Sequence, residues 1–138
     1  MQSILFLCTG NSCRSQMAEA WCRHLFPDVE AASAGIKTHG VNPNAVRVML
    51  ESGIDMSTHR SQLLSEFEPA RFTFVVTVCD NAKESCPVAL GADKLIHHSF
   101  DDPPALAASE TSEDAVLDIY RRVRDEIRDF VVQLPLMQ

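Results

Sequence analysis

The sequence has no apolar run long enough to span a membrane, and its first residues, MQSILFLCTG, carry no basic charge before a short apolar run. It is also poor in basic residues: 12 lysines and arginines stand against 19 aspartates and glutamates, so the net charge is −7. A chain with this charge is a poor general partner for nucleic acid. We therefore expect a cytoplasmic protein that binds neither membranes nor nucleic acid, in which an anionic ligand needs a local positive site.

The chain also lacks repeats, low-complexity tracts and linker-like segments. Its 138 residues, of which 46% are hydrophobic, suffice for one core. We therefore expect one domain over residues 1–138, acting as a monomer. The five cysteines are an odd number and follow no export signal, so a static disulfide framework is not expected. They are then core residues, metal ligands or reactive thiols, and we assign Cys22 to the core.

Strand-like and helix-like segments alternate along the chain, which predicts an α/β domain with a parallel sheet and right-handed crossovers. Apolar or β-branched runs predict strands at Ile4–Leu7, Glu30–Ala34, Phe72–Val78 and Lys94–Phe100. Helical spacing of apolar residues predicts helices at Ser15–Phe26 and Glu113–Gln133. Asn42 as N-cap, Pro43 in the first turn and Gly53 as C-cap predict a further helix between them.

Three residues of reactive types follow predicted strands: Cys8, Cys79 and Asp102. In open α/β sheets, ligands bind beyond the carboxyl ends of the strands. The segment CTGNSCRS, residues 8–15, would leave a strand and open a helix there, which turns backbone N–H groups and the positive end of the helix dipole toward one concavity. The sequence thus predicts an anion-binding loop that contains a nucleophile.

The residue types within this loop suit a tetrahedral oxyanion. Gly10 allows close backbone approach, Asn11 tolerates a left-handed conformation, and Arg14 can contact two oxygens at once. The same donors would stabilise the thiolate form of Cys8, which is the nucleophile. The oxyanion-binding residues are then Thr9, Gly10, Asn11, Ser12, Cys13, Arg14 and Ser15. We expect the Cys13 side chain to face away, and the missing Gly-Lys-Ser/Thr ending excludes a nucleoside triphosphate loop.

A thiolate that attacks an oxyanion must expel an oxygen, which leaves more readily once it is protonated. The segment SFDDPPAL offers Asp101 and Asp102 for this purpose, with two prolines to stiffen the loop. Aspartate and proline also favour turns, so the residues alone leave a catalytic acid and an acidic turn open. The Cys8-x5-Arg14 spacing could likewise arise by chance, and its place between a strand and a helix favours the anion loop.

CTGNSCRSQMAEA resembles the anion loop of the low-molecular-weight protein tyrosine phosphatase superfamily, and specifically of its thioredoxin-coupled arsenate reductase branch. SAGIKTHGVNP, VVTVCDNAKESCP, FDDP and YRRVRDEI resemble that branch in the same order, over essentially the whole chain. The resemblance implies a three-layer α/β/α fold with a four-stranded parallel sheet. It also implies an enzyme that reduces arsenate without a cofactor and accepts phosphate or sulfate as mimics, with Asp102 as the acid and Asp101 as a structural residue.

The resemblance further implies a relay of disulfides. Cys8 attacks arsenate, which loses water with help from Asp102; Cys79 then attacks Cys8, releasing arsenite and leaving a Cys8–Cys79 disulfide. Cys86 finally attacks Cys79, which leaves a Cys79–Cys86 disulfide for thioredoxin to reduce. Phosphorus(V) cannot be reduced in this way, so the two additional thiols distinguish a reductase from a phosphatase.

The spacing of the last two cysteines adds an expectation. If the segment were helical, its Cα atoms would lie roughly 10.5 Å apart along the axis, whereas a disulfide allows about 7 Å. We therefore expect Cys79–Pro87 to be the mobile element, which unwinds on oxidation and presents its disulfide to thioredoxin.

Other interpretations stay open. The cysteines could bind a metal with His97 and His98, although Cys79-x6-Cys86 lacks the close spacing of a zinc knuckle, and we expect no metal. The same loop and acid could hydrolyse phosphomonoesters such as phosphotyrosine. The chain could also be a non-enzymatic module that binds oxyanions or senses redox state.

Some members of the family that this chain resembles bind potassium beside the anion loop. Asn11, Glu19 and Ser33 match positions used there, but Gln62 stands where an acidic residue is expected, so we do not expect a tight potassium site. The remaining histidines are assigned to structural or surface positions: His24, His39 and His59.

Overall fold

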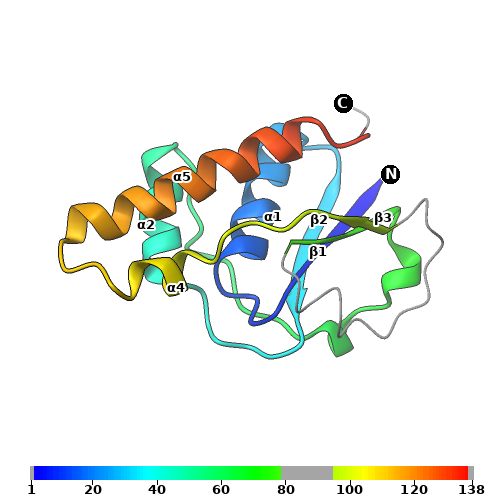
Figure 1. The fold of residues 1–138 in the computed structure, drawn as a ribbon. Helices are drawn as coiled ribbons and strands as arrows, with labels where there is room; N and C mark the ends of the chain where they lie inside the picture. Colours follow the sequence, from blue (N-terminus) through cyan, green and yellow to red (C-terminus); the bar gives the residue numbers. More distant parts are fainter. Residues whose placement is uncertain (1, 79–94, 137–138) are drawn as a thin grey trace.

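The computed structural model describes residues 2–78 and 95–136 (Figure 1). Cys79, Cys86 and the mobile segment expected at Cys79–Pro87 lie outside the described residues. Across the two described ranges, no helix combines the length and the apolar character that crossing a bilayer requires.

Four parallel strands form one sheet within the described residues, in the order β2-β1-β3-β4. They are β1 (Ser3–Cys8), β2 (Glu30–Gly35), β3 (Phe74–Thr77) and β4 (Leu95–His97). Strand β1 pairs on both edges, and each of its residues 4–7 is at most 2% exposed, which explains its unbroken apolar run. The expected four-stranded parallel sheet is confirmed.

Strands β3 and β4 are shorter than the runs that predicted them. Phe72 precedes β3 as the residue that caps a 3-10 turn, and Phe100 lies beyond β4 as a core side chain of a loop. Apolar character marks burial as well as extended backbone, so a strand expected from hydrophobicity alone extends too far at its ends.

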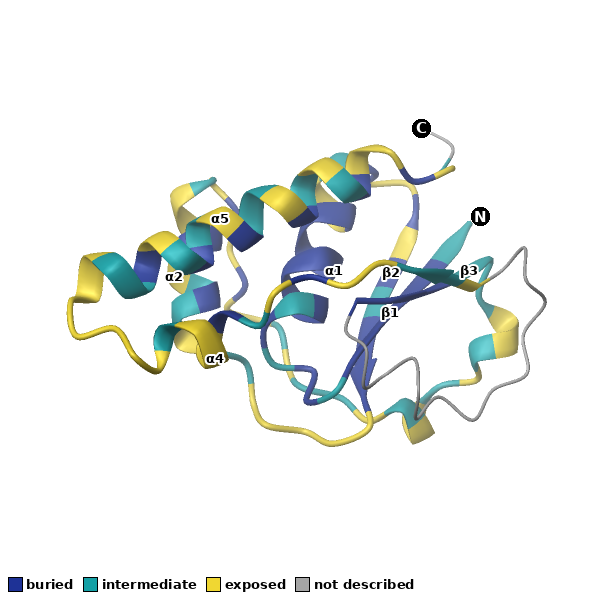
Figure 2. Ribbon diagram, in the orientation of Figure 1, coloured by how far each residue is buried: buried dark blue, intermediate teal, exposed yellow. Residues whose placement is uncertain are grey.

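The helices stack beside the sheet, with α1 (Arg14–Leu25) directly on β1 and β2. The long helix α5 (Glu113–Val132) lies across α1 and α2 (Pro43–Glu51), as Figure 1 shows. Buried residues concentrate on β1, β2 and β3, on α1 and on one side of α5 (Figure 2). The α5 residues that are buried there are Leu117, Tyr120, Val123, Ile127 and Val131. The 3.6-residue period used to expect these helices is therefore confirmed.

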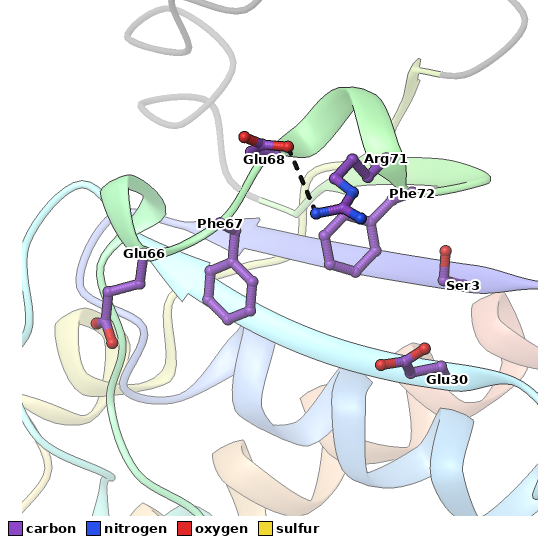
Figure 3. A pocket seen from close by; sticks show the side chains of 7 residues that line it. All are labelled: Ser3, Glu30, Glu66, Phe67, Glu68, Arg71 and Phe72. Atoms are coloured by element: carbon purple, nitrogen blue, oxygen red, sulfur yellow. Dashed lines mark ion pairs between the residues drawn. The ribbon is translucent and has the colours of Figure 1, made fainter.

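On the other face of the sheet, the chain between α2 and β3 lays two phenylalanines over β1 and β2 (Figure 3). Phe67 follows the 3-10 turn η1 (Leu64–Glu66), and Phe72 follows the 3-10 turn η2 (Pro69–Arg71). Their ring centroids lie 6.0 Å apart, edge to face. The two rings therefore pack on the sheet face opposite α1, over β1 and β2 (Figure 3).

Helix α2 begins where its cap was expected. The side chain of Asn42 accepts hydrogen bonds from two backbone N–H groups of the first turn, at 2.8 and 3.2 Å. The C-terminal expectation is wrong by one residue, because Ser52 is the cap and Gly53 follows it with a φ of 80°. A left-handed residue after the cap ends a helix, and glycine takes that conformation without a side-chain clash.

The stiff loop expected after Asp102 is instead a short helix, α4 (Pro103–Ala107). The fixed φ of proline and its missing N–H suit the first turn of a helix, so the two prolines start α4 rather than prevent it. The change places Asp102 at the helix N-terminus, next to the carboxyl ends of the strands.

Candidate active site

The predicted anion loop joins the end of β1 to the start of α1. Cys8 is the last residue of β1 and is 4% exposed, and Arg14 is the first residue of α1. Asp102 follows β4 in the same sheet, so it too lies beyond a carboxyl strand end. The structure therefore brings the predicted Cys8, Arg14 and Asp102 to one edge of the sheet; Cys79 and Cys86 lie outside the described residues.

The loop's carbonyl groups are held from outside the loop. The backbone N–H of Lys37 donates to Thr9 O at 3.0 Å, and that of His39 donates to Gly10 O at 3.0 Å. The Ser61 hydroxyl also donates to Gly10 O, at 3.1 Å. Both peptide planes are thereby fixed by donors that come from later in the chain.

The next two carbonyls are held in the same way. The Gln16 side-chain amide donates to Asn11 O at 3.2 Å, and the backbone N–H of Asn42 donates to Ser12 O at 2.9 Å. In a trans peptide group the C=O and the N–H point in opposite directions. With the carbonyls of residues 9–12 bonded outward, the N–H groups of residues 10–13 face the concavity, where the N-terminus of α1 adds partial positive charge.

Asn11 shapes the middle of the loop. It has the positive φ of 45° that was expected, and it is fully buried. Its side-chain N–H donates to the Ser15 hydroxyl at 2.9 Å, and its Oδ1 accepts from Gln16 at 2.9 Å and from the backbone N–H of Gln62 at 2.7 Å. The left-handed turn is therefore held by bonds of the Asn11 side chain to α1 and to the Gln62 backbone, and Ser15 keeps its own hydrogen as a donor.

Arg14 links the anion loop to the segment that carries the acid. Its Nη1 donates to Phe100 O at 3.0 Å, and its Nη2 lies 3.7 Å from Asp102 Oδ1. Within the described ranges, its Nε is buried and has no hydrogen-bond partner. A buried donor without an acceptor is costly, and an oxyanion bound in the concavity would supply the missing acceptor.

The carboxyl groups beside the loop differ in their contacts. The Asp102 side chain is 46% exposed and makes no capping bond to α4, so its carboxyl group is open to solvent. Asp101 instead pairs with Arg122 of α5 at 3.1 Å. The structure thus separates an aspartate that faces Arg14 from an aspartate that fastens the loop to a helix.

The other two described cysteines are buried thiols. Burial raises the pKa of Cys13 to about 12, with the positive charge of Arg14 opposing it in part. Burial also raises the pKa of Cys22 to about 12. Both therefore stay protonated at neutral pH, so Cys8 stays the candidate nucleophile of the loop.

The two adjacent histidines considered as metal ligands make other contacts. His97 Nδ1 lies 2.6 Å from the Thr77 hydroxyl, and the His98 ring stacks on Phe130 with centroids 4.8 Å apart. Over the described ranges, no group of three His, Cys, Asp or Glu side chains is arranged to hold a metal ion.

The groups expected beside a potassium ion already have partners. Ser33 donates to Glu19 Oε1 at 2.7 Å, and Arg23 pairs with Glu19 Oε2 at 3.0 Å. The Asn11 amide oxygen accepts two hydrogen bonds, from Gln16 and from the Gln62 backbone. The Arg23 cation already supplies the positive charge at Glu19, so these residues do not fit a tight potassium site.

Sequence reasoning missed two residues that touch the loop. A Cβ atom on Gly10 would lie 2.5 Å from His39 Nδ1, so the His39 ring rests against the loop backbone. Gln16 lies fully buried beneath the loop. Neither residue type indicates such a role by itself, and only the close approach at Gly10 offered a hint that another group packs there.

A separate hollow lies on the face of the sheet opposite α1 and measures about 620 Å³ (Figure 3). Its lining residues are Ser3, Glu30, Glu66, Phe67, Glu68, Arg71 and Phe72. It reaches the amino ends of β1 and β2, away from the catalytic candidates, and Glu68 there pairs with Arg71 at 3.7 Å. The strand-end site, and not this hollow, therefore contains Cys8, the candidate nucleophile.

A parallel α/β domain in which a strand-end cysteine opens an anion loop, with an arginine and an aspartate facing one another across it, has the architecture of the cysteine-dependent phosphatase class. Within that class, the family model for low molecular weight phosphotyrosine protein phosphatase matches residues 3–135. The chain belongs to this family.

Its relatives include reductases. An arsenate reductase of Halalkalibacterium halodurans is 46% identical over 125 residues, which cover 90% of this chain and 88% of the relative. Two solved structures are similar to this chain. The first is an arsenate reductase in the oxidized state, with a TM-score of 0.78, 26% identity and coverage of 97% of this chain and 96% of that chain. The second is an arsenate reductase in the phosphate binding state, with a TM-score of 0.70, 28% identity and coverage of 96% of this chain and 95% of that chain.

Proposed function

We propose that this protein is an arsenate reductase. The observation that carries the proposal is the Nε of Arg14, which is buried and has no hydrogen-bond partner among the described residues, in a loop that begins at Cys8 and whose N–H groups face one concavity. Such a site suits a tetrahedral oxyanion and a thiolate equally. The relative named arsenate reductase at 46% identity favours arsenate among the oxyanions.

In the proposed first step, the Cys8 thiolate attacks arsenic(V) of bound arsenate, and a sulfur–arsenic bond forms. Asp102 protonates the leaving oxygen, which departs as water. Arg14 and the N–H groups of residues 10–13 hold the remaining oxygens. Because Nη2 of Arg14 lies 3.7 Å from Asp102, the residue that binds the anion also orients the acid.

In the second step, Cys79 attacks the Cys8 sulfur. A Cys8–Cys79 disulfide forms, the sulfur–arsenic bond breaks, and arsenic keeps the electron pair and leaves as arsenite. Cys86 then attacks Cys79, which frees the Cys8 thiolate and leaves a Cys79–Cys86 disulfide. The dithiol of thioredoxin reduces this disulfide and completes the two-electron cycle. The relay rests on the family resemblance, since both additional cysteines lie outside the described residues.

The test is an assay of arsenate-dependent NADPH oxidation with thioredoxin and thioredoxin reductase. We expect the wild type to turn over, and Cys8→Ser, Cys79→Ser and Cys86→Ser each to lose multiple turnover by more than about a hundredfold. Cys22→Ala is the matched control, because Cys22 is a buried core thiol, and it should keep turnover. Full turnover by Cys79→Ser or Cys86→Ser would contradict the relay.

A phosphatase is the second candidate, because the family is named for that activity. Hydrolysis needs Cys8, Arg14 and Asp102 but neither additional cysteine. A phosphomonoesterase activity that exceeds arsenate reduction, and that survives Cys79→Ser together with Cys86→Ser, would favour this candidate over the reductase.

We further propose that residues 1–138 act as a single domain and as a monomer in the cytoplasm. The continuous core that joins the strands with α1 and α5 supports one domain. Sedimentation of the reduced protein should give the mass of one 15.3 kDa chain, and a dimer mass would contradict the proposal.

A further inference from the structure

Gln16 is a fully buried amide in the first turn of α1, directly beneath the anion loop. Its Nε2 lies 3.2 Å from Asn11 O, 2.9 Å from Asn11 Oδ1 and 3.0 Å from Arg60 O. All three neighbours are acceptors, so this atom must be the NH₂ group and the amide has one possible orientation.

That orientation determines which ring nitrogen of His59 carries a hydrogen. Gln16 Oε1 faces His59 Nδ1 at 2.9 Å, and an amide oxygen only accepts. His59 must therefore carry a hydrogen on Nδ1. The His59 side chain is 8% exposed, with Glu19 Oε2 at 3.7 Å from the same nitrogen, so the ring is held in place by its surroundings.

The two side chains form a chain of contacts that ends at the anion. His59 donates to Gln16, and Gln16 donates to both the backbone and the side-chain oxygen of Asn11. Holding Asn11 O outward turns the N–H of Ser12 into the concavity, and holding Asn11 Oδ1 stabilises the left-handed turn with its φ of 45°.

The same amide also fastens the segment that closes the loop from outside. Gln16 bonds to Arg60 O, while the neighbouring Ser61 donates to Gly10 O and the Gln62 N–H donates to Asn11 Oδ1. Through Arg60, Gln16 therefore joins the loop to the segment 60–62, in which Ser61 and Gln62 hold the loop directly.

We propose that Gln16 and His59 are positioning residues of the anion loop: His59 orients the Gln16 amide, and Gln16 sets Asn11 so that the loop's N–H groups converge on the oxyanion. The proposal rests on the proposed function only for the identity of the physiological anion. The test measures the binding of inorganic phosphate, which does not depend on that function. Neither side chain is placed to contact the reacting atoms, so each acts through Asn11.

The experiment measures the affinity of the reduced full chain for inorganic phosphate by calorimetry. Gln16→Met, which keeps the length and removes the donors, should bind phosphate on the order of tenfold more weakly. His59→Leu should weaken binding in the same direction. His59→Asn should restore it, because the asparagine Nδ2 occupies the position of the histidine Nδ1 and also donates.

Two controls separate positioning from general stability. Val123→Ala truncates a core side chain of α5 and should lower the melting temperature without changing phosphate affinity. The double variant Gln16→Met with His59→Leu should bind phosphate no more weakly than Gln16→Met alone, since both residues act along one path.

Unchanged phosphate affinity in Gln16→Met would overturn the proposal, and so would additive losses in the double variant. If Gln16→Met does not fold, the phosphate affinities of His59→Leu and His59→Asn are compared instead. Equal affinities in these two variants would overturn the proposal. Failure of the proposed function is a different result: the wild type would bind phosphate normally and leave arsenate unreduced.

Discussion

At the scale of single residues, Gly35 shows how tightly the loop is enclosed. A Cβ atom there would lie 2.7 Å from Asn11 N, 2.7 Å from Lys37 O and 2.8 Å from Thr9 O. All three are backbone atoms, which cannot turn aside as a side chain can. The end of β2 is therefore in direct contact with the anion loop, and only a residue without a side chain fits there.

Gly35→Ala should consequently displace the loop. We expect a loss of about 1–3 kcal/mol in the free energy of unfolding, together with weaker phosphate binding, measured by urea denaturation and calorimetry. Gly53→Ala is the matched control: its φ of 80° strains an alanine by about 1–2 kcal/mol, but no atom of residues 2–78 or 95–136 lies within 4 Å of the added Cβ. Phosphate affinity that falls in both variants alike would contradict a local effect at the loop.

The sequence allowed prediction of the residues whose chemistry depends on their type. Cys8, Arg14 and Asp102 stand out because a nucleophile, an anion clamp and an acid need those side chains near strand ends. Gln16 and His59 could not be predicted, since their contact joins positions 43 residues apart and neither side chain performs chemistry of its own. Only the fold brings them together.

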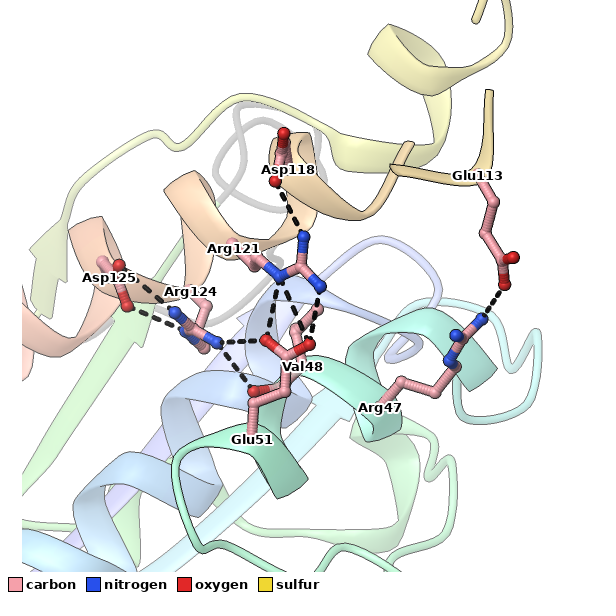
Figure 4. A network of polar contacts seen from close by, with 8 residues as sticks. All are labelled: Arg47, Val48, Glu51, Glu113, Asp118, Arg121, Arg124 and Asp125. Atoms are coloured by element: carbon pink, nitrogen blue, oxygen red, sulfur yellow. Dashed lines mark hydrogen bonds and ion pairs between the residues drawn. The ribbon is translucent and has the colours of Figure 1, made fainter. Parts of the chain in front are cut away.

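At the scale of elements, a network of charges fastens α2 to α5 (Figure 4). Glu51, the last residue of α2, pairs with Arg121 at 2.8 Å and with Arg124 at 3.0 Å, and Arg124 also donates to Val48 O at 2.9 Å. The hydrogen bond from Arg121 lowers the pKa of Glu51 from its ordinary 4.5 to about 2. The joint between the two helices thus depends on this carboxylate remaining ionised.

Glu51→Gln should therefore destabilise the protein at pH 7, by about 0.5–1 kcal/mol because the pair is partly exposed. A carboxyl group with a lowered pKa contributes stability above its unfolded pKa and loses it as the pH falls. The difference between wild type and variant should then shrink from pH 4.5 toward pH 2 in urea denaturation. A difference that stays constant across this range would contradict the assignment.

Glu113→Gln is the matched control for that experiment. Glu113 also joins α2 to α5, through Arg47 at 2.6 Å, but both side chains are more than half exposed. We expect Glu113→Gln to lower the free energy of unfolding by less than Glu51→Gln does, because it removes a single exposed pair.

Helices with polar caps were the most predictable elements. Asn42 marks the start of α2, and Ser112 accepts from the Ala115 N–H at the start of α5. Helix α4 could not be predicted in the same way, because its two prolines also suit a stiff loop. Helix α4 packs against α5, and this tertiary contact is not encoded in residues 103–107 themselves.

At the scale of the whole molecule, one core holds the strands and the helices together. Cys22 of α1 lies in it with no exposed surface, and burial raises its thiol pKa to about 12. The alternation of strands and helices predicted this α/β arrangement, whereas the strand order β2-β1-β3-β4 was not predicted, because it depends on contacts that no single segment encodes.

Cys22 consequently reports the opening of the whole core. At pH 8 iodoacetamide should label it only through unfolding, so the labelling rate should follow the population of open chains. Val123→Ala, at a cost of about 2 kcal/mol, should speed labelling about thirtyfold, as followed by mass spectrometry. Equal rates in wild type and Val123→Ala would show that Cys22 is reached through a local opening instead.

The outward-held carbonyls of residues 9–12 have a consequence for the newly made chain. Their donors arrive later in synthesis than the loop itself, at Gln16, Lys37, His39, Asn42 and Ser61. Until that later sequence has emerged and docked, Cys8 is an ordinary thiol on an unordered peptide, without the converging N–H groups. The environment that would stabilise a thiolate at Cys8 therefore forms only after the domain around the loop has folded.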